Sequence, residues 1–226
     1  MIESSNKPVL VVAPHPDDET LGAGGFLLRA HDADRPIHWL IVTKICEADG
    51  WPLEKVKRRE NEIANVSEAF GFTAVHRLGF ATAQLDILPL GELVGAIGSV
   101  VQKVEPEILL LPHRGDAHSD HRVVHDAAGA CAKWFRYPTP RWVLSYETLS
   151  ETDACVRNAE PFRADVFADI TPHLEEKIRI AKMFGDEIQP FPFPRSDDAI
   201  RGLAAVRGVA SGSRYAEAFM LHRARI

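Results

Sequence analysis

The stretch Pro8-Val-Leu-Val-Val-Ala-Pro-His-Pro-Asp-Asp-Glu19 places one imidazole and three carboxylates directly after a short apolar run. An apolar run of this length is typical of a buried strand. Ligands of α/β proteins bind in the crevice outside the carboxyl ends of parallel strands, so charged side chains at such a position indicate chemistry. The stretch therefore predicts a central strand and the first half of a functional site.

A second polar cluster stands in the same relation to another apolar run. Asp116-Ala-His-Ser-Asp-His121 follows Ile108-Leu-Leu-Leu-Pro112. Because the carboxyl ends of parallel strands meet at one edge of a sheet, we expect both clusters to emerge there. Together they predict a divalent-metal site with its own acid and base.

The apolar pattern recurs along the chain. Short apolar runs that predict strands cover 9–13, 37–43, 74–79, 107–112 and 141–146. Helix-compatible segments separate most of these runs, and 53–70 is amphipathic with the helical period. We predict an α/β fold with a mostly parallel, Rossmann-like sheet that helices cover on both faces.

The C-terminal third contains one clear helix start and one segment that no helix can cross. Thr171-Pro172 supplies a capping residue and a first-turn proline, after which Leu174, Ile178, Ala181 and Phe184 form a predicted buried stripe. The prolines of 189–194 predict an extended loop.

Size and charge narrow the class of protein. The 226 residues, 46% of them hydrophobic, predict a single domain over 1–226, with about 147–226 forming substrate-pocket loops or a small lobe. The formal net charge of −6 argues against nucleic acid as a partner. The chain shows no signal peptide and no apolar stretch near the roughly 20 residues of a membrane span, so we expect a cytoplasmic protein. A homo-oligomer is compatible with these features.

His15, Asp18 and His121 are the candidate metal ligands. A tight turn after the first strand would direct His15 and Asp18 at one ion, and His121 would add a ligand from the second cluster. Two nitrogens and one oxygen leave coordination positions open, which is typical of catalytic zinc. Iron, cobalt or manganese could use similar ligands. Zinc lowers the pKa of its water from about 15.7 to about 7, and Asp17 could accept that proton.

His118 is the candidate electrophile or acid. It precedes His121 by three residues near the start of a predicted helix, so both imidazoles share roughly one face. His118 could meet a developing oxyanion or protonate a leaving amine, with Asp120 or Asp116 fixing its tautomer. These groups predict metal-assisted amide hydrolysis.

The glycines of Gly22-Ala-Gly24-Gly25 invite a dinucleotide-binding interpretation. The GxGxxG spacing would need glycine where Leu27 stands, and the preceding carboxylates would repel a pyrophosphate. We favour close packing of a helix against a strand.

Pro14-His-Pro-Asp-Asp-Glu19 and His118-Ser-Asp-His121 resemble the motifs of the LmbE-like, or PIG-L, family of zinc-dependent N-acetylglucosaminyl deacetylases. The resemblance extends to Arg59 and Glu62, to Leu78-Gly-Phe80 and to a late stretch that includes Gly208, Gly212 and 215–219. It implies the three-layer sandwich of that family.

The resemblance also implies roles for individual residues. Metal binding falls to His15, Asp18 and His121, with Asp17 as general base and His118 as electrophile or acid. Asp120 would orient His118, and Arg59 would contact a substrate hydroxyl or phosphate. Glu47 lies where relatives place an acidic residue, without the glycine often found beside it.

The predicted activity is removal of an acetyl group from an N-acetylated amino sugar, a GlcNAc-type glycoconjugate, with zinc as cofactor. One alternative is a metal-dependent amidase for a non-sugar or thiol-conjugate amide. The other is a noncatalytic sugar-binding protein that retains the fold. Six arginines of the C-terminal third could contact an anionic aglycone, although dispersed surface positions are the favoured interpretation: Arg195, Arg201, Arg207, Arg214, Arg223 and Arg225.

Overall fold

The computed structural model describes residues 5–156 and 160–226. Its centre is a seven-stranded sheet with the strand order β3-β2-β1-β4-β5-β7-β6. The strands are β1 (Val9–Ala13), β2 (Ile37–Lys44), β3 (Ala74–Ala81), β4 (Ile108–Pro112), β5 (Trp142–Tyr146), β6 (Val166–Asp169) and β7 (Ala216–Ala224). The first five pair in parallel, while β7 runs antiparallel to β5 and β6. The predicted strands and the mostly parallel sheet are therefore confirmed, and the antiparallel end is new.

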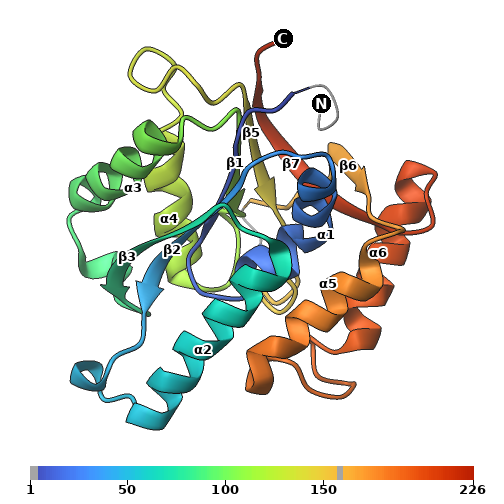
Figure 1. Ribbon diagram of the computed structural model, residues 1–226, viewed down its shortest axis with the longest axis horizontal. Coiled ribbons are helices and arrows are strands. Elements are labelled where there is room, and N and C mark those ends of the chain that lie inside the picture. Colours follow the sequence, from blue (N-terminus) through green and yellow to red (C-terminus); the bar gives the residue numbers. More distant parts are fainter. Residues whose placement is uncertain (1–4, 157–159) are drawn as a thin grey trace.

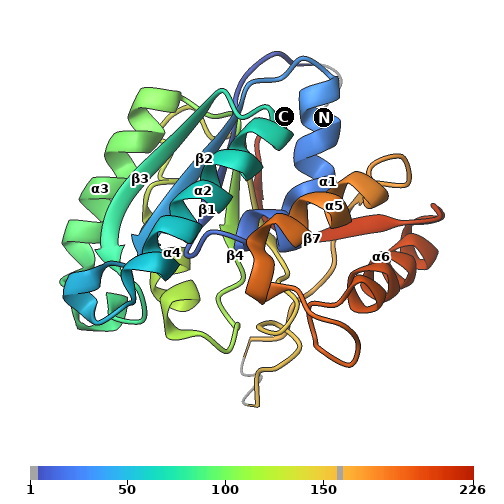
Figure 2. The same ribbon diagram turned by 60° about the horizontal axis from the view of Figure 1, so that its bottom comes forward.

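Helices cover both faces of this sheet (Figures 1 and 2). They are α1 (Asp18–Asp32), α2 (Leu53–Phe70), α3 (Leu90–Val104), α4 (Ser119–Ala130), α5 (Leu174–Ala181) and α6 (Asp197–Ser211). Helices α3 and α4 lie on one face, and α1, α2, α5 and α6 lie on the other. The architecture is the α/β three-layer sandwich that the sequence predicts.

Successive residues of β1 point to opposite faces and feed two separate cores. Val9 and Val11 pack with the residues under α1 and α5, whereas Leu10 and Val12 pack with those under α3 and α4. All four are fully buried. A strand that is buried on both faces needs a continuous apolar sequence, which explains why β1 shows no polar alternation.

The C-terminal part extends the same sheet. The stripe predicted after Thr171-Pro172 is buried on α5 and the following turn, as expected. Residues 189–194 continue no helix, but they form bends and turns rather than an extended loop. Every second residue of this segment is proline, whose fixed φ favours turns as readily as extended chain.

A buried ion pair ties β7 and α5 to the middle of α1. Lys177 Nζ lies 2.7 Å from Glu217 Oε1 and donates to the carbonyl of Leu21 at 2.8 Å. The carboxylate of Glu217 accepts hydrogen bonds from the amides of Gly25 and Phe26. The carbonyl of Leu21 and the amide of Gly25 are at positions i and i+4, which normally form a hydrogen bond with each other in a helix. Here Lys177 binds the carbonyl and Glu217 binds the amide. Helix α1 is thus fixed by polar contacts as well as by apolar packing.

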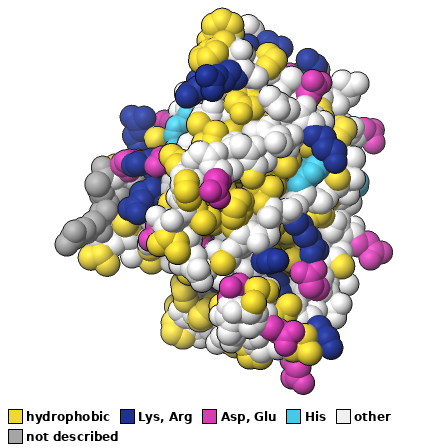
Figure 3. All heavy atoms as spheres, turned by 90° about the vertical axis from the view of Figure 1, so that its left-hand side faces the viewer, with side chains coloured by type: hydrophobic (Ala, Val, Ile, Leu, Met, Phe, Trp, Pro, Cys, Tyr) yellow, Lys and Arg dark blue, Asp and Glu magenta, His cyan; other side chains and the backbone are white. Residues whose placement is uncertain are grey.

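Charged side chains of both signs are mixed on the face shown in Figure 3, with no continuous basic surface there. Among the described residues, no helix is long and apolar enough to cross a membrane.

The glycines of α1 allow the close packing that the sequence predicts. A Cβ atom at Gly22 would overlap the ring of Tyr146 on β5, and one at Gly25 would lie 2.5 Å from Ile170 Cγ2. We expect Gly22→Ala to lower the free energy of unfolding by about 1–3 kcal/mol through overpacking. Urea unfolding monitored by circular dichroism measures this.

Gly95→Ala is the matched control, because nothing lies within 4 Å of a Cβ at this exposed position of α3. It should leave stability unchanged or raise it by up to about 1 kcal/mol. Equal effects of the two substitutions would contradict the packing account of Gly22.

Candidate active site

The connection from β1 to α1 brings His15 and Asp18 together. Asp17 caps the helix with a φ of 135°, a value that residues other than glycine rarely adopt. The amide of His15 donates to Asp18 Oδ2 at 2.9 Å, and His15 Nδ1 lies 3.4 Å from the same oxygen. This strained turn directs the side chains of Asp17 and Asp18 to different partners.

The connection from β4 to α4 adds His118 and His121. His118 caps α4, and its Nδ1 accepts a hydrogen bond from the amide of Asp120 at 3.1 Å. His121 lies one turn later, and its Nε2 is 3.3 Å from Asp18 Oδ1. The Asp18 carboxylate thus contacts imidazoles from both loops, as expected from two clusters at one sheet edge.

The donor set fits a divalent metal ion. One donor atom from each of His15, Asp18 and His121 lies within 4.8 Å of the others. His15 Nδ1 lies 3.4 Å from Oδ2 of Asp18 and His121 Nε2 lies 3.3 Å from Oδ1, so the two imidazoles face the two oxygens of one carboxylate. A second group, His15, His118 and Asp120, meets the same distance criterion and competes for His15.

Outer carboxylates support the first of these groups. His121 Nδ1 lies 2.7 Å from Asp116 Oδ2, and His15 Nε2 lies 3.1 Å from Asp120 Oδ2. Each imidazole therefore has a carboxylate on the nitrogen that faces away from Asp18. Carboxylates in this position orient ligating histidines and raise their basicity.

The electrostatics of the site favour a cation. Burial opposes charge on His15, but Asp120 and Asp18 outweigh it and raise its pKa to about 9. The pKa of His121 is raised in the same way by Asp18 and Asp116, against burial. The carboxyl pKa of Asp18 lies well below its ordinary value, because both histidines overcome the effect of burial.

Asp120 reaches His118 differently from the expected way. Its carboxylate contacts His15 and accepts hydrogen bonds from the amides of Ala83 and Leu85 at 2.8 and 3.2 Å. Its hydrogen bond to His118 comes from the backbone amide. The side chain of Asp120 therefore orients His15, and Asp116 orients His121. Because His118 Nδ1 accepts a hydrogen bond, its neutral ring carries the proton on Nε2.

Asp17 lies in a charged network that sequence reasoning missed. Arg195 Nη1 is 2.7 Å from Asp17 Oδ2, and the same guanidinium contacts Glu151 and Glu187 at 3.4 and 3.5 Å. Burial raises the pKa of Asp17 to about 7, with Arg195 opposing the shift. Arg195 is only 14% exposed, in contrast to the surface position favoured for the C-terminal arginines.

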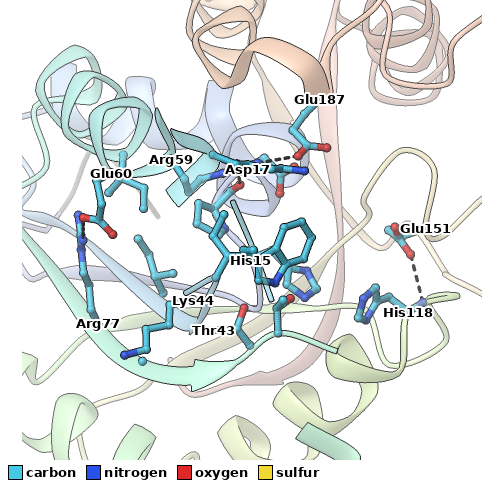
Figure 4. Close-up of a pocket in the computed structure, with 18 of the residues that line it drawn as sticks. His15, Asp17, Thr43, Lys44, Arg59, Glu60, Arg77, His118, Glu151 and Glu187 are labelled. Atoms are coloured by element: carbon cyan, nitrogen blue, oxygen red, sulfur yellow. Dashed lines mark hydrogen bonds and ion pairs between the residues drawn. The ribbon is translucent and has the colours of Figure 1, made fainter. Parts of the chain in front are cut away.

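These residues lie along one pocket with a volume of about 280 Å³ (Figure 4). His15, Asp17, Arg59, His118 and Arg195 line it, so the predicted base, electrophile and substrate contact share one cavity. Arg59 donates to the carbonyl of Pro16 at 2.9 Å and pairs with Glu62 and Glu187 at 3.2 and 2.6 Å.

Glu47, which lies where relatives place an acidic residue after the second strand, is exposed and does not line this pocket. It begins a short 3₁₀ helix, Glu47–Asp49, beyond the end of β2.

Comparisons with known proteins agree with this geometry. The model of the PIG-L family, described as GlcNAc-PI de-N-acetylase, matches residues 10–132. A diacetylchitobiose deacetylase from Thermococcus kodakarensis is 26% identical over 222 residues, which cover 93% of this chain and 81% of the relative.

Two solved structures share the fold. The conserved protein TT1542 from Thermus thermophilus has a TM-score of 0.77 at 23% identity, with 96% of each chain covered. GalB, the 4-carboxy-2-hydroxymuconate hydratase from Pseudomonas putida KT2440, has a TM-score of 0.75 at 18% identity, with 97% of this chain and 98% of that chain covered. Because the second of these is a hydratase, the fold alone does not fix the reaction.

The match to the family model spans both polar clusters and more than half of the chain. The chain belongs to the PIG-L, or LmbE-like, family and is an N-deacetylase hydrolase.

Proposed function

We propose that the protein removes an acetyl group from an N-acetylated amino sugar of the GlcNAc type, with a zinc ion held by His15, Asp18 and His121. The observation that supports this most is the position of this donor set beside Asp17 and His118, with His15, Asp17 and His118 lining a single pocket. When bound, zinc activates a water molecule near neutral pH and polarises a carbonyl group.

Asp17 is the general base of this proposal. Its carboxylate accepts a proton as water adds to the amide carbon, and the proton is then transferred to the nitrogen as the C–N bond breaks. The products are acetate and a free amine. A base is most effective when its pKa lies near the working pH, and the burial of Asp17 raises its pKa to about 7.

His118 stabilises the carbonyl oxygen. Burial and the neighbouring His15 lower the pKa of His118, so the ring is neutral near pH 7. The hydrogen bond from the Asp120 amide to Nδ1 leaves the Nε2 proton to be donated to the oxygen as negative charge develops. This arrangement favours a fixed hydrogen-bond donor over a proton-transferring acid.

Acetate release tests the proposed reaction. Metal-stripped enzyme, with and without added zinc, is assayed on GlcNAc, a GlcNAc glycoside, diacetylchitobiose and N-acetylated non-sugar amines. We expect zinc-dependent release from at least one sugar. The proposed reaction needs a zinc-activated water, and three protein ligands leave coordination positions open for it.

Zinc-dependent release from non-sugar amides alone would replace the sugar substrate by the amidase alternative. Sugar binding with no acetate release, for zinc-loaded enzyme, would favour a binding protein. The same assay with iron, cobalt or manganese in place of zinc identifies the metal that supports the highest rate.

Arg195 should set the pH at which Asp17 works. Its positive charge lowers the pKa of the Asp17 carboxyl against the effect of burial. We expect Arg195→Gln to raise that pKa, so the acidic limb of the kcat/KM profile moves to higher pH.

Arg201→Gln is the matched control, because Arg201 pairs with Glu175 on the surface and does not line the pocket. Its acidic limb should coincide with that of the wild type. If the acidic limb of a folded Arg195→Gln variant does not shift, the group that titrates in this limb is not Asp17.

A further inference from the structure

The pocket has two ends of different charge. Figure 4 shows His118 and Glu151 towards one end, and Lys44, Arg77 and Glu60 grouped at the other. The catalytic end is rich in carboxylates, including Asp17 and Glu151. We call the end with Lys44, Arg77 and Glu60 the distal end. Lys55, on the same helix as Glu60, also lines the pocket.

Lys44 has no counter-ion. It is the last residue of β2, it is exposed, and within the described ranges no carboxylate lies within salt-bridge distance of its ammonium. It lies above Gly79 of β3, where a Cβ atom would be 3.6 Å from Lys44 Cδ and 3.8 Å from Nζ. The absence of a side chain at Gly79 keeps this part of the pocket open around the ammonium.

Lys55 also lacks a carboxylate partner among the described residues. Its Nζ lies 4.6 Å from the centre of the Trp51 ring, a contact that attracts a cation without neutralising its charge. Lys55 stands in the first turn of α2, where the helix dipole opposes positive charge. The stability of α2 therefore does not account for a lysine at this position.

Arg77 is paired with Glu60. Lys44, Lys55 and Arg77 thus line the pocket, and among the described residues only Arg77 of these three has a carboxylate partner, in a protein whose formal net charge is −6. Isolated surface lysines need no explanation, but two unneutralised ammonium groups that line the same cavity as the candidate base form a local excess of positive charge. Such an excess attracts anions and strengthens their hydrogen bonds.

We infer that Lys44, Lys55 and Arg77 form a subsite for an anionic group, a carboxylate or a phosphate, on the N-acetylated substrate. This inference rests on the proposed function, since the acetamide must lie at the metal end while the anion occupies the distal end. The face of Trp51 would pack against the connecting sugar or linker. The preferred substrate is then an acidic amino-sugar derivative rather than a neutral one.

The test compares neutral and anionic substrates of the zinc-loaded enzyme. Methyl N-acetylglucosaminide is the neutral compound. The anionic compounds are N-acetylglucosamine 1-phosphate, its 6-phosphate isomer and the N-acetylglucosaminide of glycolic acid, which separate phosphate from carboxylate and one attachment point from another. We expect kcat/KM for at least one anionic compound to exceed the neutral value about tenfold or more, the size of one charge-assisted hydrogen bond.

Variants assign that preference to the distal end. In Lys44→Gln and Lys55→Gln the ratio of anionic to neutral kcat/KM should fall about tenfold each, mainly through KM. Added salt should reduce the ratio in the wild type, because screening weakens exposed charge pairs. Lys57→Gln is the matched control, since Lys57 is exposed on the same helix and does not line the pocket. Its ratio should equal that of the wild type.

Two results overturn the inference while the proposed function stands. One is turnover of the neutral compound at least as efficient as that of every anionic compound. The other is an anionic preference that survives in the double variant Lys44→Gln/Lys55→Gln. Acetate release from none of the compounds contradicts the proposed function, and the subsite with it.

Discussion

The carboxylate of Asp18 is the point on which the site depends. It is almost completely buried, and it contacts the backbone and ring of His15 as well as the ring of His121. This one side chain thus contacts both segments that follow β1 and β4. A buried carboxylate is costly unless positive charge compensates it, so the site is built to hold cations. Two imidazoles and the proposed divalent ion would satisfy that requirement together.

The rest of the fold holds this carboxylate in place. Helix α1 begins at Asp18, packs on β5 through Gly22, and is tied at its middle to Lys177 and Glu217. The antiparallel strand β7, which supplies Glu217, thus supports the helix that carries Asp18, the proposed ligand. Residues from the C-terminal part also complete the charge balance around Asp17 through Arg195.

The sequence predicts the site residues that directly follow a strand. It does not predict the residues that reach the site from distant parts of the chain. His15, Asp18 and His121 meet because β1 and β4 are adjacent parallel strands, and both strands are visible as apolar runs. Strand β6 has four residues of mixed burial, too short a pattern to recognise. Arg195 is 178 residues from Asp17, and its contact depends on the turns of 189–196. The side-chain partner of Asp120 likewise depends on tertiary contacts with His15 and Ala83.

The most direct test of the account is the location of the metal, measured by anomalous diffraction at the zinc edge on crystals of the zinc-loaded protein. We predict one strong peak about 2.0–2.2 Å from donor atoms of His15, Asp18 and His121. We also expect the other nitrogens of the two histidines to remain on Asp120 and Asp116. A peak coordinated instead by His15, His118 and Asp120 would contradict the account, because it would turn the proposed oxyanion donor into a ligand.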